Sequence, residues 1–199
     1  MIQFSDQELA NERLILDSAT ELYYLGHNLT LRDCTLVIKV PARALVIART
    51  QLINCTIEVK RELTNFRWQS AHLKGCRFTG RFRGNDFGSC PDRPEEGSIE
   101  GCDFSQAHLD ATRFLQCNIG TIRLPRWPHF TIFNPARRWQ ELVALPWPGR
   151  IGRILMEGFA ESPPTTAAVT DSATRLAKRY ATTPEAIKAV LEKMDGVYY

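Results

Sequence analysis

The sequence predicts a mainly β fold in which short strands wind into about five stacked coils, followed by α-helices. Two periodicities and one change in composition lead to this prediction. The first periodicity has five residues and the second has 21, and neither fits a helix or an isolated strand. The composition changes after Leu124, where prolines and aromatic residues replace the repeat.

The five-residue period is clearest in residues 97–121. Every fifth residue of this segment is large and apolar, namely Ile99, Phe104, Leu109, Phe114 and Ile119. The residue two places before each of them is small, namely Gly97, Cys102, Ala107, Thr112 and Cys117. In a stacked coil a small side chain fits where the wall turns, whereas a large apolar side chain fills the axis. The segment therefore predicts a repeat architecture.

The 21-residue period is carried by cysteines. Cys34, Cys55 and Cys76 are spaced by 21 residues, and each stands in the same frame between large apolar residues. The frame recurs around Cys102, which lies 26 residues after Cys76, so this coil is expected to contain an inserted loop. The polar segment 88–96, with its Pro and Gly, is assigned to that loop. One coil cannot bury its apolar face alone, so successive coils must stack as neighbouring strands do.

The small-x-large-x-x pattern resembles that of the pentapeptide-repeat family. The resemblance implies a right-handed, quadrilateral parallel β-helix, in which each pentapeptide forms one side and its large and small residues point inward. Four pentapeptides make a coil of 20 residues, so a 21-residue step adds one corner residue. The match is best at 71–80 and 97–121, and the β-helix is expected to span 22–124.

Residues 1–21 are expected to cap the first coil. Ser5 followed by Glu8 has the spacing of a capping box, which predicts a short helix over the open end. Such a cover is expected because an open coil exposes unpaired strand edges.

Residues 125–160 are expected to cap the other end. Their tryptophans and phenylalanines favour closure of the β-helix core over binding of a partner. A helix is predicted over 136–145, and the following segment 147–159 fits either a hairpin or a further helix. Residues 161–171, with two prolines and several threonines, predict a linker to the last element.

The segment 161–199 ends in a predicted pair of helices. The first covers 172–181 with Asp171 or Ser172 as N-cap, and the second runs from Pro184 to Met194. The packing residues resemble those of a helix-turn-helix unit, namely Leu176, Ala177, Ala181, Ile187 and Val190. The residues that could contact nucleic-acid phosphates are Arg175, Lys178, Arg179 and Lys188. A packing appendage or dimerising tail is favoured over DNA reading, because the second helix offers few side chains suited to base edges.

The net charge of +3 is unevenly distributed. Basic residues gather between 60 and 84, and an acidic loop follows them. The residues predicted to bind a partner are Arg67, Lys74, Arg77, Arg81, Arg83, Asp92, Glu95 and Glu96. An outward basic stripe would attract an acidic partner, and a merely solvated surface explains the same pattern equally well.

No pattern predicts catalysis, a metal site or a cofactor. The four histidines are isolated from one another, and no nucleophile or phosphate-loop motif occurs. Five of the six cysteines fall in inward positions, where cysteine acts as a small apolar residue, and no CxxC occurs. No signal segment and no apolar run of about 20 residues is found, so the protein is expected to be soluble and cytoplasmic.

These observations predict a non-catalytic protein-binding module. Pentapeptide-like bacterial proteins occur beside secreted toxins, so the resemblance implies an immunity protein or antitoxin that neutralises a toxin domain by covering its surface. The alternative is a nucleic-acid-binding regulator that uses the C-terminal helix pair. A β-helix carbohydrate-active enzyme is the third reading. The oligomeric state stays open, with a dimer through the C-terminal helices as one option.

Overall fold

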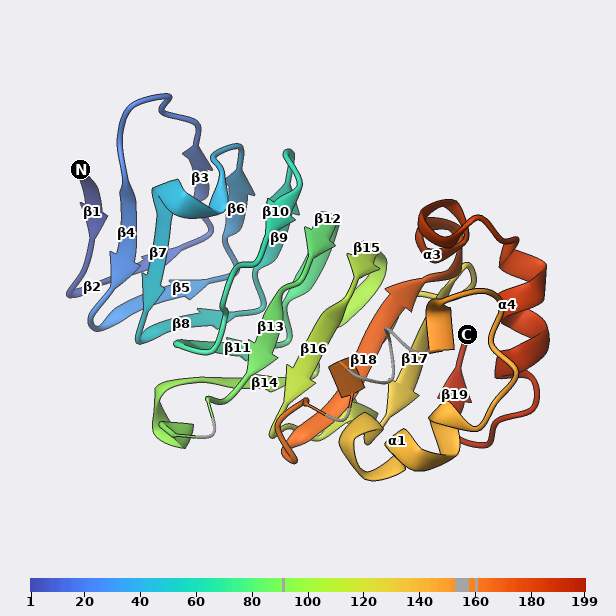
Figure 1. Cartoon of the computed structure of the whole chain (residues 1–199). Helices are drawn as coiled ribbons and strands as arrows, with labels where there is room; N and C mark the ends of the chain where they lie inside the picture. Colours follow the sequence, from blue (N-terminus) through green and yellow to red (C-terminus); the bar gives the residue numbers. More distant parts are fainter. Residues whose placement is uncertain (91, 153–157, 160) are drawn as a thin grey trace.

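The computed structural model describes residues 1–90, 92–152, 158–159 and 161–199. Short parallel strands wind through about five turns of a β-solenoid, and an antiparallel sheet with helices follows at the C-terminal end (Figure 1). The prediction of a mainly β, coiled fold with a helical C-terminal part is therefore confirmed.

Stacked strands form three sides of the solenoid. The first side contains β1 (Ile2–Phe4), β4 (Tyr23–Gly26) and β7 (Leu45–Ala48). The second contains β2 (Gln7–Ala10), β5 (Leu29–Arg32), β8 (Thr50–Ile53), β11 (Ala71–Lys74) and β14 (Ser98–Glu100). The third contains β3 (Arg13–Leu16), β6 (Thr35–Ile38), β9 (Thr56–Val59), β12 (Arg77–Arg83) and β15 (Asp103–Asp110).

The fourth side changes along the solenoid. In the first two turns it consists of the loops 17–22 and 39–44, the second of which contains the 3-10 helix η1 (Ala42–Ala44). In later turns it consists of β10 (Leu63–Thr64) and the second halves of β12 and β15, which pair with one another.

The register between turns follows the predicted period. Thr35 lies opposite Thr56, which lies opposite Arg77, so both steps are 21 residues. The step grows to 26 residues between β11 and β14, where His72 lies opposite Ser98. The additional residues lie between β13 (Asp86–Gly88) and β14 and include the 3-10 helix η2 (Pro94–Glu96). The predicted 21-residue step and the inserted loop are both confirmed.

The corner between the second and third sides explains the cysteine spacing. Its residues have left-handed backbone, with φ between 54° and 64°, and they are Asn11, Asp33, Asn54, Gly75 and Gly101. Asn, Asp and Gly adopt this conformation at the lowest cost. The residues that follow four of these corners point inward and are fully buried, namely Cys34, Cys55, Cys76 and Cys102.

Residues 1–21 do not form the predicted helical cap. Strands β1, β2 and β3 pair with β4, β5 and β6, so this segment is the first turn of the solenoid. Of the capping-box residues, Ser5 lies between β1 and β2, and Glu8 lies in β2. The reason is tertiary: apolar residues such as Leu9 and Leu14 pack on the solenoid core, and this pairing outweighs a local helix signal.

The predicted linker 161–171 is wrong over its second half. Strand β18 (Thr166–Ser172) begins there and pairs antiparallel with both β16 (Thr112–Leu115) and β17 (His129–Phe133). β19 (Val197–Tyr198) pairs with β17 at one edge of the sheet, and β13 pairs parallel with β16 at the other. The five strands thus have the order β13-β16-β18-β17-β19, and the pairs from β16 to β19 are antiparallel. β-Branched residues of β18 fit this central position, because they pack well on a pleated surface covered on both faces.

The antiparallel sheet lies between two apolar cores. Ala168, Phe133 and Tyr198 pack on the solenoid core, which also contacts the 3-10 helix η3 (Ile119–Thr121) in part. Phe130 and Ile132 point to the other face and pack against the helices. The sheet therefore closes the C-terminal end of the solenoid and carries the helical part of the cap.

The predicted helices are present as α1 (Pro135–Val143), α3 (Ala173–Tyr180) and α4 (Pro184–Leu191). The Ser172 hydroxyl accepts the N–H of Arg175, which confirms Ser172 as an N-cap. Of the aromatic residues expected to close the β-helix core, Phe133 packs on that core, whereas Phe130 and Trp147 are buried in the second core and Trp139 is 38% exposed. The prediction for 147–159 falls partly outside the described residues.

Candidate partner-binding surfaces

Strand β12 presents three of the predicted partner-binding residues. Phe78 and Phe82 are fully buried, whereas Arg77, Arg81 and Arg83 are exposed, as the alternation of a half-buried strand requires. Between them the strand bends at Gly80, where φ is +105° and an added Cβ would lie 2.0 Å from the Val59 carbonyl oxygen. The bend places Arg77 on the third side of the solenoid and the other two arginines on the fourth.

The remaining predicted basic residues do not join this group. Lys74 ends β11 on the second side, and Arg67 forms a parallel bridge with Asp86 of β13. The predicted basic residues therefore do not form one surface, because they lie on different sides of the solenoid. The physical reason is that a coil changes direction every few residues, so only side chains one turn apart share a side.

The predicted acidic residues lie in the inserted loop. Asp92 is exposed, and Glu96 forms ion pairs of 3.5 Å with both Arg49 and Arg93. The Glu95 side chain lies outside the described part of the chain. The loop is thus partly neutralised by its own surroundings.

The charges along β12 are only partly neutralised. Arg83 lies 3.1 Å from Glu62, and Arg77 lies 4.0 Å from Asp103. Arg81 lies opposite His108 of β15 and forms no ion pair among the described residues. The strand therefore keeps an excess of positive charge toward solvent.

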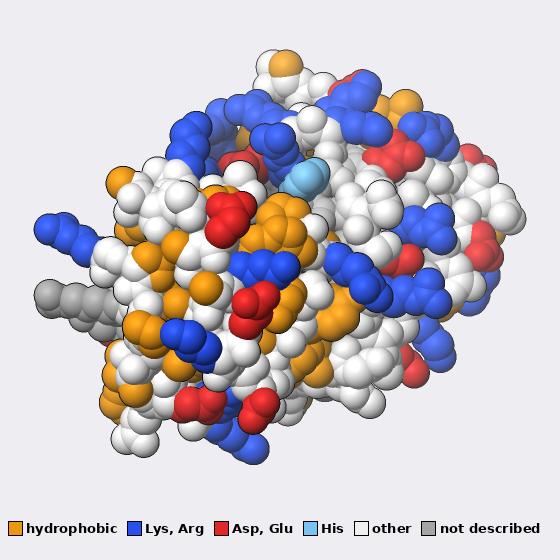
Figure 2. Space-filling model, turned by 90° about the vertical axis from the view of Figure 1, so that its right-hand side faces the viewer, with side chains coloured by type: hydrophobic (Ala, Val, Ile, Leu, Met, Phe, Trp, Pro, Cys, Tyr) orange, Lys and Arg blue, Asp and Glu red, His pale blue; other side chains and the backbone are white. Residues whose placement is uncertain are grey.

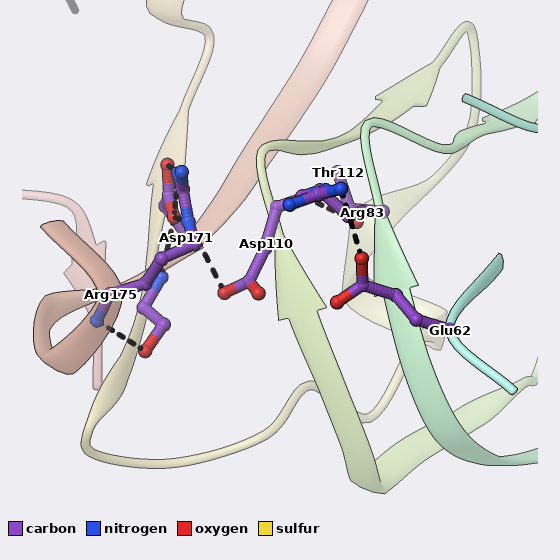
Figure 3. A network of polar contacts seen from close by, with 7 residues as sticks. Glu62, Arg83, Asp110, Thr112, Asp171 and Arg175 are labelled. Atoms are coloured by element: carbon purple, nitrogen blue, oxygen red, sulfur yellow. Dashed lines mark hydrogen bonds and ion pairs between the residues drawn. The ribbon is translucent and has the colours of Figure 1, made fainter. Parts of the chain in front are cut away.

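A charge network joins the cap to the solenoid beside this strand (Figure 3). Arg175 of α3 donates to the buried carboxylate of Asp171, with an Nη2–Oδ2 distance of 2.6 Å. Its Nε also lies 3.4 Å from Asp110 of β15. Burial raises the pKa values of Asp171 and Asp110, and the charge of Arg175 opposes that shift for both carboxyls. The network was not predicted from the sequence, because Asp171 was expected only as the end of a linker or as an N-cap of the following helix.

Two of the predicted phosphate contacts are engaged by other residues of the chain. Arg175 is committed to the two carboxylates, and Lys188 lies 5.5 Å from the Trp127 ring and 6.0 Å from the Tyr199 ring. Lys178 and Arg179 are exposed on α3, and Arg179 lies over the Tyr180 ring. Figure 2 shows the face of the molecule at the end that carries α3 and α4. Hydrophobic side chains gather near the middle of this face, with Lys and Arg side chains among and around them.

Two of the four histidines lie near each other. His129 is buried, and its ring lies 5.5 Å from that of His108. Burial, with the nearby His108, lowers the pKa of His129 to about 4, so it is neutral at pH 7. Among the described residues no group of three His, Cys, Asp or Glu side chains could hold a metal ion.

A groove of about 730 Å³ lies where the last solenoid turn meets the antiparallel sheet. We call it the terminal groove. Its apolar lining consists of Ile119, Ile122, Leu124, Phe133 and Tyr198, and its basic residues are Arg123 and Arg126. The sequence identified Leu124 only as the end of the repeat. The groove could not be found from the sequence, because Arg126, Phe133 and Tyr198 come from the cap.

No described helix is long and apolar enough to cross a membrane. No protein-family model matches the sequence, and neither characterised proteins nor solved structures gave a significant match. The function is therefore argued from the surfaces described above.

Proposed function

We propose that this protein is a bacterial, cytoplasmic, non-catalytic protein-binding module of the immunity type. It covers the active surface of a toxin domain, and the covered surface is acidic. The observation that supports it most is the arrangement of Arg77, Arg81 and Arg83 on one strand of a closely packed solenoid. The resemblance of residues 97–121 to pentapeptide repeats, whose bacterial members occur beside toxins, supports the inhibitory form of the proposal.

The strand is well suited to recognition because its core is rigid. The Phe78 ring stacks on the Phe104 ring with centroids 4.4 Å apart, and Phe82 and Phe87 pack against Phe78 edge-on. The arginines therefore project from a backbone that loses little freedom on binding, which lowers the entropic cost of association.

The charge favours an acidic partner. Arginine forks bind carboxylates in pairs of hydrogen bonds, and arginine is enriched among the residues that dominate interface energies. The excess positive charge along β12 would also raise the association rate with an acidic surface.

The alternative, nucleic-acid binding by α3 and α4, has less support. Two of the four predicted phosphate contacts, Arg175 and Lys188, are engaged within the chain. Glu185 of α4 and its C-cap residue Glu192 are both exposed and would repel phosphates.

Affinity capture from the native cell lysate tests the proposal. The bait is the full-length protein, with and without nuclease treatment, and bound proteins are identified by mass spectrometry. We expect a stoichiometric protein partner that survives nuclease and is lost with Arg77→Glu/Arg81→Glu. The control Arg137→Glu/Lys193→Glu makes the same change in net charge on the cap and should keep the partner.

Three other results would count against the proposal. Equal capture by the Arg77→Glu/Arg81→Glu variant would show that β12 is not the interface. Recovery of nucleic acid that disappears on deletion of residues 172–199 would favour the regulator. Turnover of a carbohydrate substrate would favour the enzyme.

A further inference from the structure

We propose that the terminal groove is a second binding site of this module, and that it takes an acidic protein segment with a large apolar side chain. The inference rests on the proposed function in one respect, namely that the partner is a protein. It differs in location, because the groove lies at the end of the solenoid and is formed jointly with the cap.

The floor of the groove is apolar and incompletely covered. Within the solenoid the inward residues Phe104 and Leu109 are fully buried, because a further turn or the cap covers them. At the end, Ile119, Phe133 and Tyr198 pack on the core only in part. A volume of about 730 Å³ is in the range of pockets that accept a large side chain or a small ligand. Burying an apolar side chain there would be favourable in proportion to the area removed from water.

The groove is built on fixed backbone. Arg123 donates its N–H to the Cys102 carbonyl at 2.9 Å, and its own carbonyl accepts the N–H of Phe104 at 2.7 Å. The segment around Arg123 is therefore the last rung of the third side, held as firmly as a strand. Its side chain is exposed beside the apolar floor.

The charge of the groove selects the partner. Arg123 and Arg126 are both exposed, and neither forms an ion pair within the described part of the chain. Among the residues that the structure describes, no acidic side chain lines the groove. A carboxylate-bearing segment would be attracted to both arginines, and a basic segment would be repelled.

The groove also adjoins the arginine-bearing strand. Arg77, Asp103 and Arg123 follow one another across three successive turns and line a neighbouring shallow groove. A partner that reaches the terminal groove can therefore contact Arg77 at the same time. Two weak contacts of one partner reinforce each other when the chain between them spans the distance.

Selection from a random peptide library tests this inference without knowledge of the natural partner. Phage-displayed 16-residue peptides are selected on the full-length protein, and the best peptide is measured by fluorescence anisotropy. We expect the selected peptides to share acidic residues beside a Phe, Tyr, Trp or Leu. Binding should weaken at least tenfold with Arg123→Glu/Arg126→Glu and with Ile119→Ser, which changes the floor without a charge.

The matched control is Arg43→Glu/Arg61→Glu, which alters two exposed arginines on early turns and should leave peptide binding unchanged. Circular dichroism of each variant checks that it folds. The inference is overturned if no acidic and apolar consensus emerges, or if the groove variants bind the selected peptide as the wild type does. Groove-dependent binding of a labelled oligonucleotide, or dimerisation that the groove variants abolish, would assign the groove to a different occupant and also overturn it.

The outcome is separable from that of the proposed function. If the groove variants capture the native partner normally and select no peptide, the groove inference fails while the binding module stands. If neither the wild type nor any variant captures a protein partner, the proposed function as a protein-binding module is wrong.

Discussion

The solenoid and the C-terminal cap are both built on buried apolar residues, but they are held together differently. In the solenoid a residue meets its equivalent one turn away, as Leu31 pairs with Leu52 and Leu52 with Leu73. In the cap, Thr170 lies opposite both Thr112 and Thr131, which come from two separate parts of the sequence. The solenoid therefore repeats one contact many times, whereas the cap depends on a few contacts that occur once.

This difference has consequences for stability. Solenoid turns contribute similar nearest-neighbour terms, so a fault in one turn weakens the turns on both sides. The cap can separate as a unit when one of its particular contacts fails, because local unfolding follows cooperative units. Substitutions in the two regions should therefore produce different patterns of damage.

The largest expected effect is in the solenoid. Phe104 is fully buried and stacks on Phe78, so Phe104→Asp places a carboxylate on the axis without a partner. We expect a loss of at least about 4 kcal/mol in the free energy of unfolding, enough to unfold a domain of ordinary stability. Urea unfolding followed by circular dichroism measures it. Ser105→Asp is the control, since Ser105 is exposed next to the same site. Wild-type stability of Phe104→Asp would refute the assigned inward register.

A smaller and more local effect is expected where the cap joins the solenoid. Asp171→Ala leaves Arg175, which is 23% exposed, with only the longer contact to Asp110. We expect a loss of about 2 to 3 kcal/mol, below the value for a fully buried pair because water reaches the guanidinium. Amide hydrogen exchange should show faster exchange in β17–β19 and unchanged exchange in β5 and β8. Equal loss of protection in both regions would contradict the separate behaviour of the cap.

The same junction should respond to acid through His129. Its pKa is lowered from about 6.5 to about 4, so the unfolded chain binds a proton more readily over that interval. Stability contributed by the neutral ring is present above pH 6.5 and is lost as the pH falls toward 4. We expect this loss to reach about 3 kcal/mol at pH 4.

Thermal unfolding at pH 7 and pH 4 measures the effect, and His129→Gln isolates it from other titrating groups. The variant should lose less stability than the wild type between these two values. His72→Gln is the control, because His72 lies on the outer surface and bonds Ser98. Identical pH profiles for wild type and His129→Gln would show that the ring is not held neutral.

The same contrast explains what could be predicted from the sequence. The sequence of the solenoid is periodic, because every turn needs a small residue at the corner and an apolar residue inside. Cys34, Cys55 and Cys76 reveal the step directly. The sequence of the cap has no such period. Residues 166–171 contain strand signals in Val169 and the threonines, but the prolines just before them suggested a linker. Their partners in β16 and β17 could not be identified without the fold.

The candidate surfaces were predictable to a lesser degree. The exposure of Arg77, Arg81 and Arg83 followed from the alternation of one strand. The grouping of Arg67 and Lys74 with them was wrong, because a corner separates residues that are close in sequence. Arg123 and Arg126 were not identified, since their importance depends on Phe133 and Tyr198 from the cap.

The smallest expected effect on stability concerns Arg83, at the outer end of the charge network. Its side chain is 49% exposed and its partner Glu62 is 34% exposed, so water and salt screen the pair. We expect Arg83→Ala to change the free energy of unfolding by no more than about 0.5 kcal/mol, in contrast to Asp171→Ala at the inner end. Urea unfolding at low and high salt measures this difference.

Partner binding should give the opposite ranking. Arg83→Ala should weaken capture of an acidic partner, because its arginine faces solvent on the proposed interface, whereas Asp171→Ala removes no exposed cation. Glu62→Ala serves as the matched control, since it breaks the same ion pair but leaves the arginine free for a partner. If Arg83→Ala and Glu62→Ala weakened binding equally, the ion pair would act only by ordering the surface, and Arg83 would make no direct contact with the partner.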